Sequence, residues 1–194
     1  VALCLAWTWL LRDGRVLFLL ALPALFLAWV ATSLPLFPFE RPLPPASRER
    51  DIKVVEFNVL GTNRRRAREI AAFVVDQRPD IAFLLESQWV QRHIDLLRTH
   101  LPYAAPCEPG TPLRFCDLIL MSHHPLRNVQ RLGLATGRNR LIIAETTIHG
   151  QDITLVAVHL TKPLLSGRQR REIAVLAQQI ASLPRPIIVA GDFN

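Results

Sequence analysis

The sequence contains very little lysine and has no cluster of cysteine and histidine residues at zinc-binding spacing. Lys53 and Lys162 are the only lysines among 23 basic residues, so arginine carries nearly all of the positive charge. Without a Cys/His cluster, the sequence argues against a zinc site. It also lacks a Walker A glycine loop, a nucleophile elbow around a serine and an internal repeat. These absences argue against P-loop nucleotide binding, serine-hydrolase chemistry and a solenoid.

The net charge is strongly positive, at +7 for 194 residues, with a sequence pI of about 10.6. This balance favours anionic partners such as phosphates, nucleic acid or acidic lipid headgroups. The alternative, that the charge serves only solubility, is equally open. The excess of arginine over lysine is also typical of a bacterial codon bias.

The first 39 residues are almost wholly apolar, whereas the rest alternates apolar and polar stretches. Residues 16–39 are uncharged, and a membrane-spanning helix needs ~20 apolar residues. We therefore predict a transmembrane region at 1–39, with a full helix at 16–37 and the end of an earlier helix at 1–11. A cleaved signal peptide is the competing interpretation. Residues 40–50 are rich in proline and arginine and are expected to form a linker from the membrane.

The orientation in the membrane depends on two opposing signals. Arg12 and Arg15, between the two apolar runs, favour a cytoplasmic loop, but three arginines between residues 41 and 50 argue the other way. Cys107 and Cys116 flank a turn-rich stretch and are either a disulfide, which needs an oxidising compartment, or two unrelated thiols. We predict a bacterial inner-membrane protein with a periplasmic or other extracytoplasmic domain.

Residues 51–194 are predicted to form a layered α/β domain with a mixed sheet, because strands alternate with helices but neighbouring strand pairs also occur. The predicted strands cover 52–60, 81–85, 118–121, 141–148, 153–160 and 186–190, and the predicted helices cover 64–77, 89–100 and 168–182. Asn63 is the expected N-cap of the first helix. The expected inward face of the last helix comprises Ile173, Leu176, Ala177 and Ile180.

Polar side chains gather where four predicted strands end. Asn58 lies near the end of its strand, Glu86 directly follows the next, and His159 is near the end of a third. Asp192 and Asn194 follow the last strand. Each has an ordinary structural explanation, as a turn residue, an exposed acid or a core histidine. Their common placement favours a site, because loops leaving strand ends form the sites of sheet proteins.

The chemistry of this set is coherent. Carboxylate and amide oxygens suit a hard divalent ion such as Mg²⁺ (or Mn²⁺). A histidine beside the ion can hydrogen-bond a phosphate oxygen or transfer a proton, and a second carboxylate can orient the attacking water. The ion would stabilise charge on a phosphoryl group.

Four segments carry a family resemblance: Glu56–Leu60, Arg78–Glu86, Val158–Leu160 and Ile188–Asn194. In this order, the chain from Asp51 to Asn194 is similar to the endonuclease/exonuclease/phosphatase superfamily, and the apolar start resembles its bacterial membrane-anchored members. The resemblance implies an α/β (α+β) four-layer αββα sandwich. It also implies a C-terminal Ser-Asp-His-like motif, which is not among the 194 residues, so the chain is expected to be truncated at both ends and inactive by itself.

By motif position, the resemblance implies roles for five residues. Asn58 and Glu86 would hold the metal. His159 would contact the scissile phosphate, Asp192 would orient or deprotonate the attacking water, and Asn194 would help to place the water and the phosphate.

The resemblance also implies a phosphate-binding arginine, for which Arg140 fits best and Arg138 is the second choice; the alternative for both is a solvated turn. The expected function is membrane-anchored hydrolysis of phosphodiester or phosphomonoester bonds. Its partners would be a lipid bilayer and a nucleic acid, lipid headgroup or soluble phosphate. A phospholipid or sphingomyelin phosphodiesterase and a non-catalytic membrane scaffold are the alternatives, and the oligomeric state is not predicted.

Overall fold

The computed structural model describes residues 23–29, 51–108, 110–134, 137–163 and 167–194. The chain divides into two compact units, Val1–Ser47 and Arg48–Asn194. In the first unit, residues 23–29 form a short exposed helix. The remainder of the predicted transmembrane region and the linker at 40–50 lie outside the described residues. Within the described part of the chain, no helix is both long and apolar enough to span a membrane.

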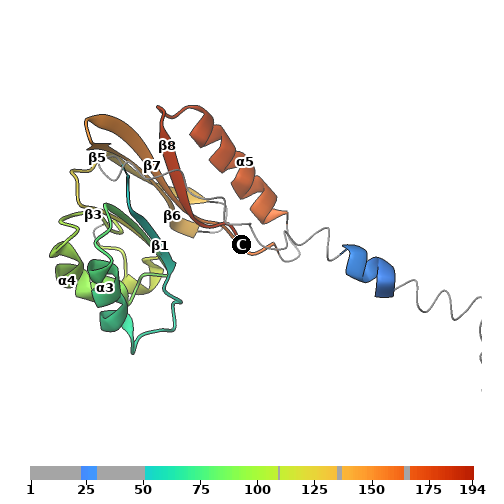
Figure 1. The fold of residues 1–194 in the computed structure, drawn as a ribbon, viewed down its shortest axis with the longest axis horizontal. Helices are drawn as coiled ribbons and strands as arrows, with labels where there is room; N and C mark the ends of the chain where they lie inside the picture. Colours follow the sequence, from blue (N-terminus) through green and yellow to red (C-terminus); the bar gives the residue numbers. More distant parts are fainter. Residues whose placement is uncertain (1–22, 30–50, 109, 135–136, 164–166) are drawn as a thin grey trace, which may run out of the picture. The chain divides into compact units, whose positions relative to one another are not determined.

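The second unit contains two four-stranded sheets (Figure 1). The first has the order β1-β2-β4-β3, with β1 at Val54–Asn58, β2 at Ile81–Leu85, β3 at Tyr103–Ala105 and β4 at Leu118–Ser122. The second has the order β5-β6-β7-β8, with β5 at Arg127–Leu134, β6 at Gly137–Ile148, β7 at Gln151–His159 and β8 at Ile187–Asp192. Both sheets are mixed, because β1–β2 and β7–β8 are parallel pairs and the other pairs are antiparallel.

Three apolar clusters fill the spaces between the layers of sheets and helices. One lies between the sheets and includes Phe83 and Leu120 of the first sheet with Ile142 and Leu155 of the second. Another packs the outer face of the first sheet against α3 (Ala67–Asp76), the 3-10 helix η1 (Val90–His93) and α4 (Ile94–Arg98). The third packs the outer face of the second sheet against α5 (Arg168–Ala181). The α/β four-layer αββα sandwich expected from the resemblance is therefore confirmed.

Every residue of β2 and β4 is buried, because both faces of these strands are covered. Their even and odd side chains enter different clusters, since Phe83 faces the second sheet and Leu84 faces α3. A strand covered on both faces is apolar throughout rather than alternating.

Several predicted elements differ in their ends. The first helix begins at Ala67 rather than Arg64, and its N-cap is Arg66, so the expectation of an Asn63 cap is wrong. Instead, the Asn63 N–H donates to Leu60 O at 2.8 Å, which places Asn63 in the turn before the helix. The helix predicted at 89–100 is divided into η1 and α4. Strands β3 and β5 were not predicted.

The inward face of α5 differs from the prediction. Leu176 is buried and Ile180 packs against the same apolar cluster, as predicted, but Ala177 is exposed and Ile173 is 46% exposed. Glu172 is instead fully buried, and its carboxylate accepts hydrogen bonds from the N–H and hydroxyl of Thr161, at 2.7 and 2.9 Å. A buried carboxylate needs such donors, and this contact places Glu172 on the inward face of the helix.

Candidate active site

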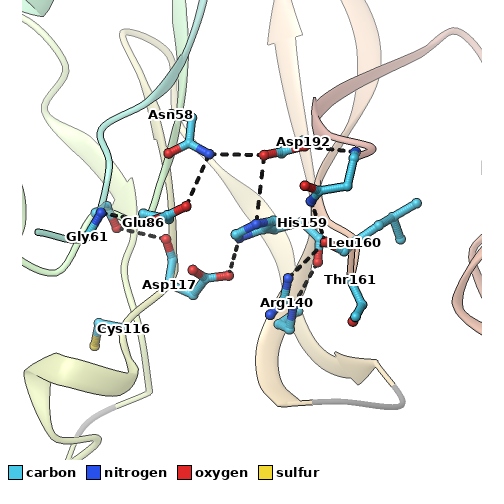
Figure 2. Close-up of polar contacts among 12 residues, drawn as sticks. Asn58, Gly61, Glu86, Cys116, Asp117, Arg140, His159, Leu160, Thr161 and Asp192 are labelled. Carbon is cyan, nitrogen blue, oxygen red and sulfur yellow. Dashed lines mark hydrogen bonds and ion pairs between the residues drawn. The ribbon is translucent and has the colours of Figure 1, made fainter. Parts of the chain in front are cut away.

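One edge of each sheet supplies the polar cluster predicted from the sequence. The parallel strands β1 and β2 end together, since Asn58 is in register with Leu85, and Glu86 follows directly. The parallel strands β7 and β8 likewise end together, with His159 in register with Asp192. Figure 2 shows Asn58 and Glu86 of the first sheet facing His159 and Asp192 of the second.

Asn58 connects the two sheets. Its Nδ2 donates to Glu86 Oε1 at 3.3 Å and to Asp192 Oδ2 at 3.0 Å (Figure 2). Its Oδ1 accepts from the Leu60 N–H at 3.0 Å. The amide therefore lies between two carboxylates whose residues are far apart in the sequence.

Glu86 has a strained backbone. Its φ of 48° lies in the left-handed region, which costs a non-glycine residue on the order of 1–3 kcal/mol. The Gly61 N–H donates to its Oε2 at 2.6 Å, so the carboxylate is held at both oxygens. Such strain persists where surrounding contacts fix the position, as at a functional site.

Asp117, which immediately precedes β4, was not predicted as a site residue. Its Oδ2 accepts from His159 Nδ1 at 2.7 Å, while His159 Nε2 lies 3.9 Å from Asp192 Oδ2. Because β4 runs antiparallel to β2, the residue before β4 reaches the same sheet edge as the residue after β2. That antiparallel placement is the signal that could have found Asp117.

The main chain of Asp117 is also held in place. Its carbonyl accepts the N–H of Ser87 at 3.0 Å and the Ser87 hydroxyl at 3.2 Å, and Ser87 is fully buried. The carboxylate that contacts His159 is thus fixed to the segment that carries Glu86.

The loop after β8 is tightly folded. Asp192 Oδ1 accepts the Asn194 N–H at 2.8 Å, and Asn194 Nδ2 donates to Leu160 O at 2.7 Å. Gly191 has a φ of 144°, and a Cβ placed there would lie 1.8 Å from Val158 O. Only glycine therefore allows β8 to approach β7 closely enough to place Asp192 beside His159.

Arg140 reaches the site from strand β6, which is the neighbour of β7 in the second sheet. Its Nε donates to His159 O at 2.8 Å and one Nη donates to Leu160 O at 3.0 Å (Figure 2). It therefore holds the end of β7 and is not in a solvated turn. Arg138 belongs to strand β6, but its side chain lies outside what the structure describes.

A pocket of about 820 Å³ opens beside these groups. Its lining comprises Glu86, Gln88, Glu108, Gly110, Thr111, Pro112, Arg114, Phe115, Asp117, Asn139, Arg140 and His159. Much of one wall is the loop between Cys107 and Cys116, which are joined as a disulfide with their Cα atoms 5.5 Å apart. This resolves the choice between a disulfide and two unrelated thiols.

The donor set fits a hard divalent cation. Three carboxylates, those of Glu86, Glu108 and Asp117, line the pocket and supply its acidic oxygens. Outside the lining, partial burial and, second to it, the charge of Asp192 raise the pKa of Glu56. Asn58 turns its NH₂ toward two carboxylates, and an amide flip would present oxygen instead. The described residues contain no group of three or more His, Cys, Asp or Glu side chains arranged around a metal position. The fit therefore rests on mixed amide and carboxylate oxygens.

The fold and the site define a two-sheet sandwich with an acidic, histidine-containing cluster where the strands end. The family model of the Endonuclease/Exonuclease/phosphatase family matches residues 55–194. The chain belongs to this family, whose name denotes enzymes that cleave phosphoester bonds. No match is found among the curated proteins.

Three solved structures illustrate the likeness in fold. TDP2 from D. rerio, complexed with a single-strand DNA product, is 23% identical, with a TM-score of 0.60, over 74% of this chain and 60% of that one. Sphingomyelinase C from Streptomyces griseocarneus is 18% identical, with a TM-score of 0.57, over 74% and 64%. Beta toxin from Staphylococcus aureus (F277A, P278A mutant), with bound magnesium ions, is 13% identical, with a TM-score of 0.58, over 74% and 65%. The chain thus spans less than two thirds of each of these structures.

Proposed function

We propose that the protein is a divalent-metal-dependent hydrolase of phosphodiester or phosphomonoester bonds. The observation that carries this proposal is the meeting of Asn58, Glu86 and Asp192 with the Asp117–His159 pair at one sheet edge. Family membership and the magnesium bound by the similar beta toxin support it.

In the proposed mechanism, Asn58 and Glu86 would hold Mg²⁺ or Mn²⁺, and the ion would supply Lewis-acid stabilisation of charge on the phosphoryl group. Asp192 orients the attacking water or takes its proton, and Asn194 helps to place that water and the phosphate. His159 hydrogen-bonds a phosphate oxygen through Nε2, because Nδ1 is engaged by Asp117.

Arg140 is the proposed phosphate-binding cation, with Arg138 as the second choice. The Arg140 guanidinium lines the pocket and uses two of its five N–H donors on backbone carbonyls. The same side chain can therefore hold the end of β7 and present positive charge to a phosphate.

Replacing His159 with alanine tests the proposal. In the whole protein, His159→Ala should lower kcat for Mg²⁺-dependent hydrolysis of bis(4-nitrophenyl) phosphate on the order of 100-fold, the size typical of losing one catalytic proton-transfer or hydrogen-bonding group. His123→Ala is the matched control, because His123 is exposed at the other end of β4. Equal activity of both variants would remove His159 from the site, and an absence of Mg²⁺-dependent hydrolysis in the wild-type protein would favour the non-catalytic scaffold instead.

We also propose that residues 16–37 anchor the domain to a bacterial inner membrane, with the domain on the extracytoplasmic side. The uncharged run at 16–39 supports the anchor, and the Cys107–Cys116 disulfide favours an oxidising compartment. Recovery of the whole protein in the soluble rather than the membrane fraction would contradict this part.

A further inference from the structure

A second pocket of about 390 Å³ adjoins the first. Its lining comprises Gly61, Gln88, Trp89, Arg92, Pro112, Leu113 and Arg114. Gln88, Pro112 and Arg114 line both pockets, so the two hollows are contiguous. Gly61 also ties the second pocket to the proposed metal site, because its N–H donates to Glu86 and its carbonyl accepts from Trp89 Nε1 at 2.7 Å.

The second pocket is built around an aromatic ring flanked by arginines. The guanidinium carbons of Arg64 and Arg92 lie 5.1 and 4.8 Å from the centre of the Trp89 ring. Arg114 similarly lies 4.7 Å from the centre of the Phe115 ring. Of these arginines, Arg92 and Arg114 line the second pocket, so their cation–π contacts hold two guanidinium groups at its wall.

The two pockets differ in charge. Carboxylates of Glu86, Glu108 and Asp117 line the first pocket. The lining of the second, among the described residues, includes Arg92 and Arg114 but no carboxylate. Arg114 and Arg140 line the first pocket as well, so it suits a cation together with a phosphate group, whereas the second pocket suits an anion directly beside them.

We propose that the second pocket binds the phosphate group next to the scissile phosphate in a nucleic-acid strand. This inference rests on the proposed function, because the first pocket must hold the scissile phosphate. Guanidinium groups match phosphate oxygens with paired hydrogen bonds. A positively charged groove that tracks the phosphate backbone is one component of single-strand binding sites.

A phosphocholine lipid headgroup fits this surface poorly. A quaternary ammonium group needs a free aromatic face. Arginine guanidinium groups already lie over both rings beside the pockets, Trp89 and Phe115. The same arginines repel a second cation, so the surface selects a polyanion.

The test compares two substrates in the whole protein with Mg²⁺. A single-stranded oligodeoxynucleotide has flanking phosphates, whereas bis(4-nitrophenyl) phosphate has none. Arg92→Gln should lower the ratio of kcat/KM for the oligonucleotide to kcat/KM for the small diester on the order of tenfold, mainly through KM. Arg98→Gln is the matched control, because Arg98 pairs with Asp95 and lines neither pocket.

The wild-type protein provides a second measurement that needs no variant. Its kcat/KM for the oligonucleotide should fall with salt concentration, whereas that for the neutral-flanked diester should change little. A ratio that is the same in Arg92→Gln and Arg98→Gln, or an equal salt dependence of both substrates, would overturn the inference. Cleavage of sphingomyelin vesicles in preference to the oligonucleotide would also overturn it.

Failure of this inference is distinguishable from failure of the proposed function. If neither diester is hydrolysed with Mg²⁺, the proposed function fails and the subsite fails with it. If the small diester is hydrolysed but the oligonucleotide is not, or Arg92→Gln leaves the ratio unchanged, the hydrolase stands and only the nucleic-acid subsite is wrong.

Discussion

The Asp117–His159 pair shows what single residues could and could not reveal in advance. His159 was identified because it stands at the end of an apolar strand within a recognisable motif. Asp117 has no motif, and it meets His159 at 2.7 Å across 42 residues of sequence. Only the antiparallel pairing of β2 with β4 brings it to the site. A polar residue just before an antiparallel strand, such as Asp117, therefore cannot be identified as a site residue from the local sequence pattern alone.

Asp117 is expected to act as a positioning residue for His159. A hydrogen bond to a charged group contributes roughly 1.5–3 kcal/mol. Asp117→Asn should therefore lower kcat on bis(4-nitrophenyl) phosphate on the order of 10- to 100-fold with little change in KM. The measurement is steady-state kinetics with Mg²⁺, accompanied by a thermal melt.

Asp95→Asn is the matched control for this variant, because Asp95 is exposed on α4 and only pairs with Arg98 at 3.9 Å. A surface pair of this kind contributes little. If Asp117→Asn changes only the melting temperature, or changes KM rather than kcat, the positioning role is contradicted.

Among the helices and strands, the long regular ones could be predicted from the sequence pattern, and the short or irregular ones could not. Helix α5 was predicted to within one residue at its C-terminal end. Strand β3 has only three residues, and β5 is half polar with two register irregularities against β6, so neither has a clear alternation. The predicted face of α5 was right at Leu176 and Ile180 and wrong at Ile173 and Ala177, and the buried contact of Glu172 with Thr161 is a polar part of this face that the apolar pattern did not predict.

The disulfide-closed segment between Cys107 and Cys116 is expected to stabilise the fold. Closing a loop of about ten residues removes conformational freedom from the unfolded chain and stabilises by roughly 2–3 kcal/mol. The double variant Cys107→Ser/Cys116→Ser should lose about that much free energy of unfolding. Denaturant unfolding monitored by circular dichroism measures it.

The wild-type protein treated with a thiol reductant is the matched comparison for this prediction. Reduction should lower its stability to that of the double variant, and should not change the double variant. Equal stability of the oxidised wild type and the double variant would show that the bridge does not contribute.

At the scale of the whole molecule, the site exists because two sheets end at the same edge. Asn58 and Asp192 are 134 residues apart in the sequence, yet the Asn58 Nδ2 donates a hydrogen bond to Asp192 Oδ2 at 3.0 Å. The family resemblance predicted the sandwich and the five motif residues. The arginine pair at Trp89 could not be predicted, because Arg64 and Trp89 meet only when the turn before α3 packs beside the segment after β2. Contacts between loops depend on the assembled fold.

We propose that Asn58 and Glu86 at this edge would hold a divalent ion with which the protein hydrolyses phosphoester bonds. The most direct measurement is the rate of bis(4-nitrophenyl) phosphate hydrolysis by the whole protein as Mg²⁺ is titrated. Wild-type activity should rise with Mg²⁺ and disappear with chelator. Glu86→Gln should lower it on the order of 100-fold, while the exposed Glu69→Gln on α3 should not. Undiminished, Mg²⁺-dependent hydrolysis by Glu86→Gln would contradict the account.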